Sequence, residues 1–164
     1  MKLKERIDEA ELILVGIGEE FEEKVICDKD AVLLAYDNLA GLLKDKNYYI
    51  VSLPKDGLIF DAGFDKERVA APFYDEEETG KEKWDKYLRW LSLTLNRKLF
   101  VLELGVGLSV PEVIRWPFEK TVMYNNKATL LRVNGSLPNI PVEISDRATG
   151  FSHDSVSFLS CLDS

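Results

Sequence analysis

Two glycine turns, each placed directly after an apolar run, are the residues of this chain best suited to bind a nucleotide. The first turn contains Gly16 and Gly18, and the second contains Gly105 and Gly107. Bare backbone at the carboxyl end of a parallel strand, followed by a helix, is where nucleotide phosphates bind, because the N–H groups at the helix start face the ligand. The sequence therefore predicts a nucleotide pocket at these turns.

Two carboxylates follow the first turn at once. Glu19 and Glu20 stand directly after Gly18. A carboxylate in the first turn of a helix interacts favourably with the free N–H groups and the dipole, by about 0.3–1 kcal/mol, and it competes for the position of a pyrophosphate. Two interpretations stay open: the ordinary preference for acidic residues at a helix start, or a protein carboxylate that fills the anion site. Both disfavour phosphate binding there.

Other kinds of reactive site find little support in the sequence. The chain lacks the G-x-S-x-G, P-loop and H-E-x-x-H motifs, and its one histidine, His153, has no accompanying signature. Asp56 with Asp61, or the run 76–78, could form a carboxylate pair or a divalent-cation site, but such residues are more often solvated. We therefore expect no metal centre.

The order of several short motifs resembles that of the sirtuins, which are NAD-dependent deacylases and ADP-ribosyltransferases. Residues 50–57, followed by 61–64, are similar to the sirtuin segment in which a strand leads into T-x-N-x-D-G and then A-G. The turn 16–18 stands where sirtuins have their first G-A-G, and residues 105–111 resemble their G-T-S-L-x-V-x-P, one residue shorter. The likeness is greatest to the compact bacterial sirtuins linked to macrodomains.

This resemblance implies a Rossmann-like, doubly wound parallel sheet and a pocket for NAD or ADP-ribose. Asn134 closes a predicted strand at the place of the sirtuin asparagine that contacts the adenine ribose. The residues that the resemblance assigns to the cofactor are Gly16, Gly18, Asp56, Gly105, Gly107, Ser109 and Asn134.

The same resemblance implies that catalytic residues are missing. Pro54 stands in place of the sirtuin asparagine that holds the nicotinamide ribose, and no histidine lies between Pro54 and Gly105. A positioned base contributes about 10²–10⁴ in rate. We therefore expect a non-catalytic nucleotide-binding or regulatory module that binds NAD or ADP-ribose weakly. The alternatives are an active NAD-consuming enzyme, either an ADP-ribosyltransferase or an NAD glycohydrolase, and a purely structural subunit.

The composition predicts a single globular domain. A chain of 164 residues is long enough to bury its own core. The net charge of −8 disfavours nucleic acid as a partner, and the absence of a long apolar run predicts a cytoplasmic protein without a membrane span. Cys27 and Cys161 are far apart, and the four-cysteine zinc ribbon of ordinary sirtuins is missing, so we expect no zinc.

Apolar strands alternate with helical patterns, which is typical of a parallel sheet covered on both faces. Residues 55–80 show no periodicity, and we expect an irregular excursion or a lid there. The predicted strands are 12–15, 48–53, 99–104, 128–134 and 142–144, and the predicted helices are 2–10, 31–43 capped by Asp30, 81–96, a helix from Pro111 to about 125, and 155–162 capped by Asp154.

Overall fold

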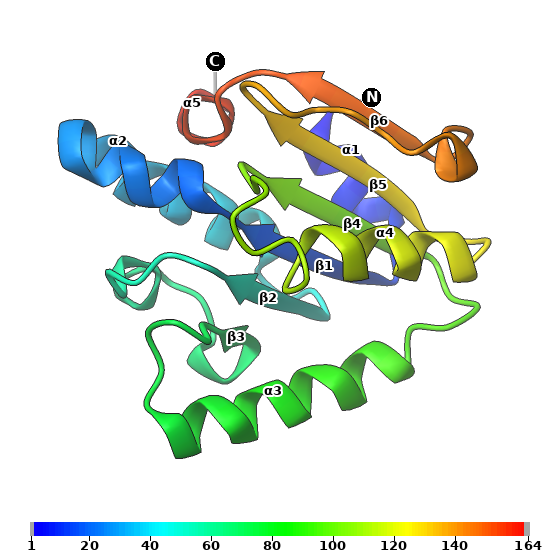
Figure 1. Cartoon of the computed structure of the whole chain (residues 1–164), viewed down its shortest axis with the longest axis horizontal. Coiled ribbons are helices and arrows are strands. Elements are labelled where there is room, and N and C mark those ends of the chain that lie inside the picture. The colour runs from blue at the N-terminus through cyan, green and yellow to red at the C-terminus, as the bar shows by residue number, and fades with distance from the viewer. Residues whose placement is uncertain (1, 163–164) are drawn as a thin grey trace.

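The computed structural model describes residues 2–162, which form a parallel sheet between two layers of helices (Figure 1). The strands are β1 (Leu12–Ile17), β2 (Tyr48–Ser52), β3 (Val69–Ala70), β4 (Leu99–Leu104), β5 (Thr129–Asn134) and β6 (Ala148–Ser152). The helices are α1 (Leu3–Glu9), α2 (Glu19–Leu43), α3 (Glu77–Ser92), α4 (Arg115–Tyr124) and α5 (Ser155–Ser160), with short 3₁₀ turns η1 (Leu58–Asp61), η2 (Lys66–Arg68) and η3 (Val142–Ile144).

The strand order is β3-β2-β1-β4-β5-β6, and all neighbouring strands run parallel. Following the chain, β2 and β3 are added on one side of β1, and β4, β5 and β6 are then added on its other side. The connections therefore diverge at the carboxyl ends of β1 and β4, which is where doubly wound sheets bind ligands. The predicted fold class is confirmed.

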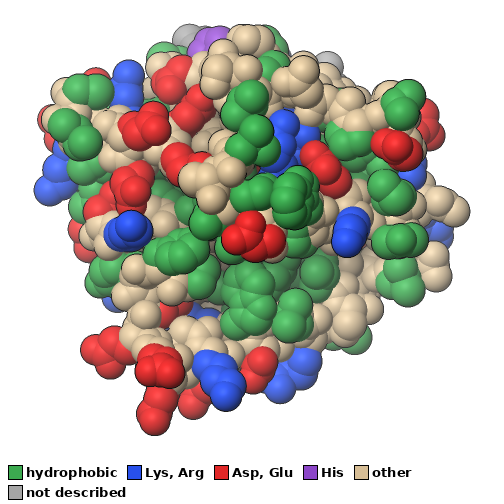
Figure 2. Space-filling model, in the orientation of Figure 1, with side chains coloured by type: hydrophobic (Ala, Val, Ile, Leu, Met, Phe, Trp, Pro, Cys, Tyr) green, Lys and Arg blue, Asp and Glu red, His purple; other side chains and the backbone are tan. Residues whose placement is uncertain are grey.

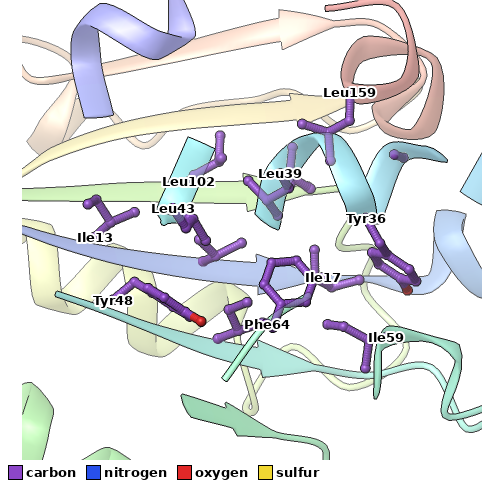
Figure 3. Close-up of a cluster of buried hydrophobic side chains, with 14 of the residues drawn as sticks. Ile13, Ile17, Tyr36, Leu39, Leu43, Tyr48, Ile59, Phe64, Leu102 and Leu159 are labelled. Carbon is purple, nitrogen blue, oxygen red and sulfur yellow. The ribbon is translucent and has the colours of Figure 1, made fainter. Parts of the chain in front are cut away.

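Side chains of each strand point alternately to two apolar clusters, one on each face of the sheet. Ile13 and Val15 point to the first cluster, which α1, α2 and α5 cover. Figure 3 shows Ile13 of β1 near Leu43 of α2 in this cluster. Leu12 and Leu14 point to the second cluster, under α3 and α4. Burial on both faces explains why the strands are apolar throughout.

Helix α2 contains a break at Asp28, whose φ of −155° and ψ of 74° are not helical. The Asp28 carboxylate accepts a hydrogen bond from the N–H of Ala31 at 3.1 Å, so it caps the second half of the helix. The predicted cap at Asp30 was therefore wrong by two residues. The break itself separates an acidic first segment from the apolar segment that covers the sheet.

Residues 55–80 contain more regular structure than their sequence suggests. Strand β3 pairs with β2, and η1 and η2 lie between them along the chain. The Asp75 carboxylate, directly before the acidic run 76–78, accepts a hydrogen bond from the N–H of Ala71 at 2.9 Å and lies 3.4 Å from Lys83 Nζ. This segment therefore packs on the edge of the sheet.

Two predictions near the carboxyl terminus were wrong. Residues 142–144 form η3 instead of a strand, and the last strand is β6, where four of five residues are exposed. An exposed edge strand carries no apolar run, so its sequence pattern is weak. Helix α4 begins at Arg115 and not at Pro111, which lies in the preceding turn. The Asp154 cap is confirmed, since its carboxylate accepts from Ser157 N–H at 2.9 Å.

Among residues 2–162, none of the helices combines the length and apolar character that crossing a membrane would require.

Candidate functional site

The two predicted glycine turns touch each other at the carboxyl edge of the sheet. A Cβ atom added to Gly18 would lie 2.3 Å from the carbonyl oxygen of Gly105 and 2.4 Å from the Cα of Val106. Only glycine permits this approach. Gly16 lies within β1, two residues before Gly18. A Cβ atom added to Gly16 would lie 2.7 Å from Ile114 Cγ2, so the absence of a side chain makes room for the segment that leads into α4.

Glu19, the first residue of α2, fills the turn after β4. Its carboxylate accepts hydrogen bonds from the N–H of Gly107 at 3.0 Å and from Ser109 Oγ at 2.6 Å. Partial burial acts to raise the pKa of the Glu19 carboxyl, but the hydrogen bonds from Ser109 and Gly107 outweigh it and hold the pKa below its ordinary value. Two residues that the resemblance assigns to the cofactor therefore bind a side chain of the protein.

Glu20 fills the neighbouring turn, after β5. Its carboxylate accepts from the N–H of Gly135 at 2.8 Å, and from the N–H and Oγ of Ser155 at 3.1 and 2.7 Å. Gly105 lies beneath it with a positive φ of 66°, and an added Cβ there would lie 2.7 Å from Glu20 Cβ. The left-handed backbone and the close contact both require glycine at this position.

Glu22 reaches to the other side, where it accepts a hydrogen bond from the N–H of Lys55 at 2.6 Å, in the loop after β2. Glu19, Glu20 and Glu22, here called the glutamate triad, thus each accept N–H groups from a different loop at the carboxyl edge. Backbone N–H groups that converge beside a helix start form an anion site. In this structure the anions are the protein's own carboxylates.

Asn134 lies at the end of β5 and is only 2% exposed. Its Nδ2 donates to the carbonyl of Val106 at 2.9 Å, and its Oδ1 accepts from the N–H groups of Ser136 and Leu137 at 3.0 and 2.9 Å. Both ends of the amide are therefore used to hold the turns after β4 and β5. In this arrangement the side chain fixes the two turns, and a ribose contact would require it to exchange one of these partners.

The segment after β2 places Pro54 in a buried position and Asp56 on the surface. The Asp56 carboxylate accepts from the N–H of Leu58 at 3.0 Å. Nearby, Tyr36 Oη and Ser52 Oγ are buried without a hydrogen-bond partner among the described residues. Burial raises the pKa of Tyr36, and the negative charges of Asp56 and Glu22 raise it further, so this hydroxyl is neutral.

A buried charged pair that was not predicted from the sequence lies within the sheet, in β4 and β5, the two strands that lead into these turns. Arg132 of β5 lies opposite Glu103 of β4 in the register, and its guanidinium forms a two-pronged ion pair with that carboxylate. Its Nη2 also lies 2.8 Å from Glu119 of α4. Arg115 donates to the carbonyls of Val106 and Leu137 at 3.1 and 3.2 Å. The sequence signal for this pair was one charged residue in each of two otherwise apolar strands, Glu103 in β4 and Arg132 in β5.

His153 lies in the loop between β6 and α5, where its N–H donates to the carbonyl of Asn134 at 3.2 Å while its side chain takes no part in this arrangement. Its Nδ1 is 2.9 Å from the carbonyl oxygen of Asp154, and its ring stacks on Phe151. Among residues 2–162, no group of three or more His, Cys, Asp or Glu side chains is placed to hold a metal ion. The glutamate triad lies in the first turn of α2, and its carboxylates accept N–H groups from three loops.

The layer formed by α3 and α4 carries exposed apolar side chains. Figure 2 shows hydrophobic side chains gathered on the face that carries α3 and α4. Leu88 and Leu95 lie there with Tyr124 around a cavity of about 530 Å³, and all three side chains are about half or more exposed. Apolar surface of this kind is typical of contact sites between proteins.

Comparison with known proteins supports the fold more than the chemistry. No family model matches the chain. A solved structure of the sirtuin Sir2Tm bound to a propionylated peptide superposes with a TM-score of 0.62, at 15% identity, over 97% of this chain and 96% of the other. The resemblance to sirtuins is thus confirmed at the level of the fold.

A curated protein of Fusarium oxysporum f. sp. cubense matches a shorter stretch. It is named a probable bifunctional ADP-ribose hydrolase/ADP-ribosyltransferase, and it is 38% identical over an alignment of 73 residues that covers 42% of this chain. The match spans 12% of that protein's length.

Proposed function

We propose that this chain is a non-catalytic regulatory module with the sirtuin fold, in which the protein's own carboxylates occupy the phosphate site of a nucleotide. The observation that carries the proposal is the glutamate triad. Each of its members accepts an N–H from a different loop at the carboxyl edge of the sheet. The partner is then a protein, or a small nucleotide bound weakly, and we expect neither nucleic acid nor a membrane.

Electrostatics supports this proposal. A diphosphate that approached the turns after β4 and β5 would meet the negative charges of Glu19 and Glu20, and the N–H groups of Gly107 and Gly135 are already hydrogen-bonded to them. Binding would require displacement of these carboxylates and would place like charges close together, which is unfavourable at short range. NAD and ADP-ribose should therefore bind more weakly than the fold alone suggests.

The residues available for catalysis support it as well. Pro54 contributes no polar side-chain atom, and Asn134 is engaged with the turns around it. His153 stacks on Phe151 and its Nδ1 contacts the Asp154 carbonyl. A reaction that needs an unengaged ribose-orienting amide and a histidine base, each worth orders of magnitude in rate, finds neither among the described side chains at this edge.

An active NAD-consuming enzyme is the second candidate, either an ADP-ribosyltransferase or an NAD glycohydrolase. The stretch shared with the Fusarium protein, whose name refers to ADP-ribose chemistry, favours it. So does the fold shared with Sir2Tm. The two candidates differ in one measurable quantity, which is turnover of NAD.

Calorimetry and a nicotinamide-release assay on the same sample separate the two candidates. We expect no nicotinamide above background from NAD with acyl-lysine peptides, and weak binding of ADP-ribose. Substituting Glu19→Gln with Glu20→Gln should tighten ADP-ribose by about tenfold, since each carboxylate at a helix start is worth up to about 1 kcal/mol. Adenosine, which lacks phosphate, should bind unchanged.

Glu23→Gln is the matched control, because Glu23 is exposed and belongs to the same helix turn. It removes one negative charge without touching the turns, so ADP-ribose affinity should stay at the wild-type value. Sustained nicotinamide release by the wild-type protein would establish the enzyme instead. If the double variant leaves ADP-ribose affinity unchanged, the glutamate triad does not guard the phosphate site.

A further inference from the structure

A cavity of about 1130 Å³ lies on the layer of helices formed by α1, α2 and α5. Leu131 of β5 and Thr149 and Phe151 of β6 line it from the sheet, and α1 and α5 line its sides. Neither the glutamate triad nor the residues that donate hydrogen bonds to it belong to the lining. The cavity is thus separate from the nucleotide site of the fold, and its volume suits a small ligand with room to spare.

The charge of this cavity is opposite to that of the whole chain. Among residues 2–162, its lining includes the cations Lys2, at the N-cap of α1, and Lys4 and Arg6 of α1, together with one carboxylate, Asp37. The protein as a whole has a net charge of −8. A concave surface with three cations and one anion in such a protein concentrates positive potential, which favours an anionic ligand.

Two of these cations have other contacts. Lys4 Nζ forms an exposed ion pair with Asp8 at 2.6 Å, and such pairs are worth little in water, so the ammonium can also face a ligand. Arg6 lies over the ring of Phe100 at 4.6 Å, which holds its position. Lys2 precedes the helix at its N-cap position. One fixed cation and two adaptable ones therefore line the α1 side.

Aromatic rings line the other side. Phe151 stacks on His153 with ring centroids 5.2 Å apart and an interplanar angle of 14°, and it meets Phe158 edge-on at 5.9 Å. Phe151 is nevertheless 43% exposed, although a ring of this size normally gains from burial. A planar ligand ring that lies against Phe151 would cover it and extend the stack.

We propose that this cavity binds a small planar aromatic anion of the nucleoside monophosphate class. The base stacks against Phe151, and the phosphate lies at the α1 side, near Lys2 and Lys4. Thr149 also lines the cavity and offers a hydroxyl to the sugar. This cavity does not include the glutamate triad, on which the proposed function rests, so the two proposals are tested independently.

Titration with AMP, followed by NMR chemical shifts and calorimetry, tests the site. AMP should bind, and adenosine and inorganic phosphate should each bind at least about tenfold more weakly, because each lacks one half of the recognition. Phe151→Ala should weaken AMP by about tenfold, as loss of one base stack does. Lys2→Glu with Lys4→Glu should weaken AMP and leave adenosine unchanged.

The Glu19→Gln, Glu20→Gln variant serves as the comparison, since it removes two carboxylates at the other site and none of the residues that line this cavity. AMP affinity that responds to this variant, and not to Phe151→Ala, would place the ligand at the glutamate triad and overturn the proposal. Phosphate that binds as tightly as AMP would show that the rings do not contribute, which also overturns it. Shift changes confined to Phe151, His153 and α1 are the result that supports the proposal.

Discussion

Glu20 and Ser155 join the first turn of α2 to the first residue of α5, although 135 residues separate them in the sequence. The carboxylate accepts from both the N–H and the Oγ of Ser155, and Ser155 is fully buried. A further hydrogen bond from Gly135 N–H completes the set. One side chain therefore satisfies donors from two segments that lie beyond β5.

Replacing Glu20 by alanine should destabilise the protein by about 2–3 kcal/mol, because a buried N–H and hydroxyl lose a charged acceptor. Urea unfolding followed by circular dichroism measures this loss. Glu23→Ala, on the same exposed turn of the helix, should change the free energy of unfolding by less than about 0.5 kcal/mol. Equal effects of the two substitutions would show that the contacts of Glu20 contribute nothing.

The contribution of Glu19 should depend on pH in a defined direction. Its pKa is lowered in the folded protein, because hydrogen bonds from Ser109 and Gly107 outweigh the opposing effect of burial. The stabilisation is thus fully present above the unfolded value of about 4.3, and it is lost as the pH falls through the lower folded value.

Unfolding curves of wild-type protein and Glu19→Gln, collected between about pH 7 and pH 3, measure this dependence. Their stability difference should be constant near neutral pH and should shrink in the acidic part of the range. Ser109→Ala should reproduce part of the effect. A difference that does not change with pH would contradict the lowered pKa.

The buried pair of Glu103 and Arg132 should show strong non-additivity. Arg132→Met alone leaves a buried carboxylate without its partner and should cost about 3–5 kcal/mol. Combining it with Glu103→Leu removes both charges, so the double variant should be more stable than Arg132→Met. Chemical denaturation of the two single variants and the double variant gives the interaction energy. If the double variant were the least stable, the pair would matter for reasons other than burial of charge.

Gly18→Ala should separate the two glycine turns. The added Cβ would lie 2.3 Å from a backbone oxygen of the second turn, which cannot move aside easily, so we expect a loss of about 1–3 kcal/mol. Gly41→Ala is the matched control within α2, because nothing lies within 4 Å of its added Cβ. That change should stabilise the helix by about 0.5–1 kcal/mol. Thermal unfolding distinguishes the opposite signs.

Removal of metal should leave the protein unchanged. Cysteine occurs twice and histidine once in the chain, so the ligands of a structural zinc site are scarce. We expect the same thermal midpoint with and without a chelator. Stoichiometric zinc in the purified protein, or a large drop in the midpoint on chelation, would show that a site exists.

The sheet could be predicted because its central strands are apolar on both faces and follow one another with helices between. β4 and β5 have nearly the predicted bounds for this reason. β3 has only two residues, and β6 is an exposed edge, so neither leaves a periodic pattern. Their pairing depends on neighbouring strands that are distant in the sequence, and the residues alone do not reveal it.

For the candidate site, the sequence located the turns but could not give the partners. The position of Glu19 and Glu20 after Gly18 raised the idea of a carboxylate in the anion site, with an ordinary helix start as the alternative. Only the fold brings Gly107 and Gly135 to those carboxylates. Glu22 was missed, because its partner in the loop after β2 has no sequence signature. The use of Asn134 within the chain was likewise invisible.

The long sequence separation of the contacts of Glu20 has a consequence for synthesis on the ribosome. Its donors Gly135 and Ser155 follow it by 115 and 135 residues. At about 5–20 residues per second, the start of α2 waits for many seconds before they emerge. During that interval the Glu20 carboxylate lacks its protein donors and is hydrated, although Lys55 and Gly107, the donors to Glu22 and Glu19, have been synthesised earlier. The hydrogen bonds between Glu20 and Ser155 therefore form late in folding. A nascent chain stalled before β6 lacks Ser155 and leaves part of the Glu20 carboxylate exposed to solvent.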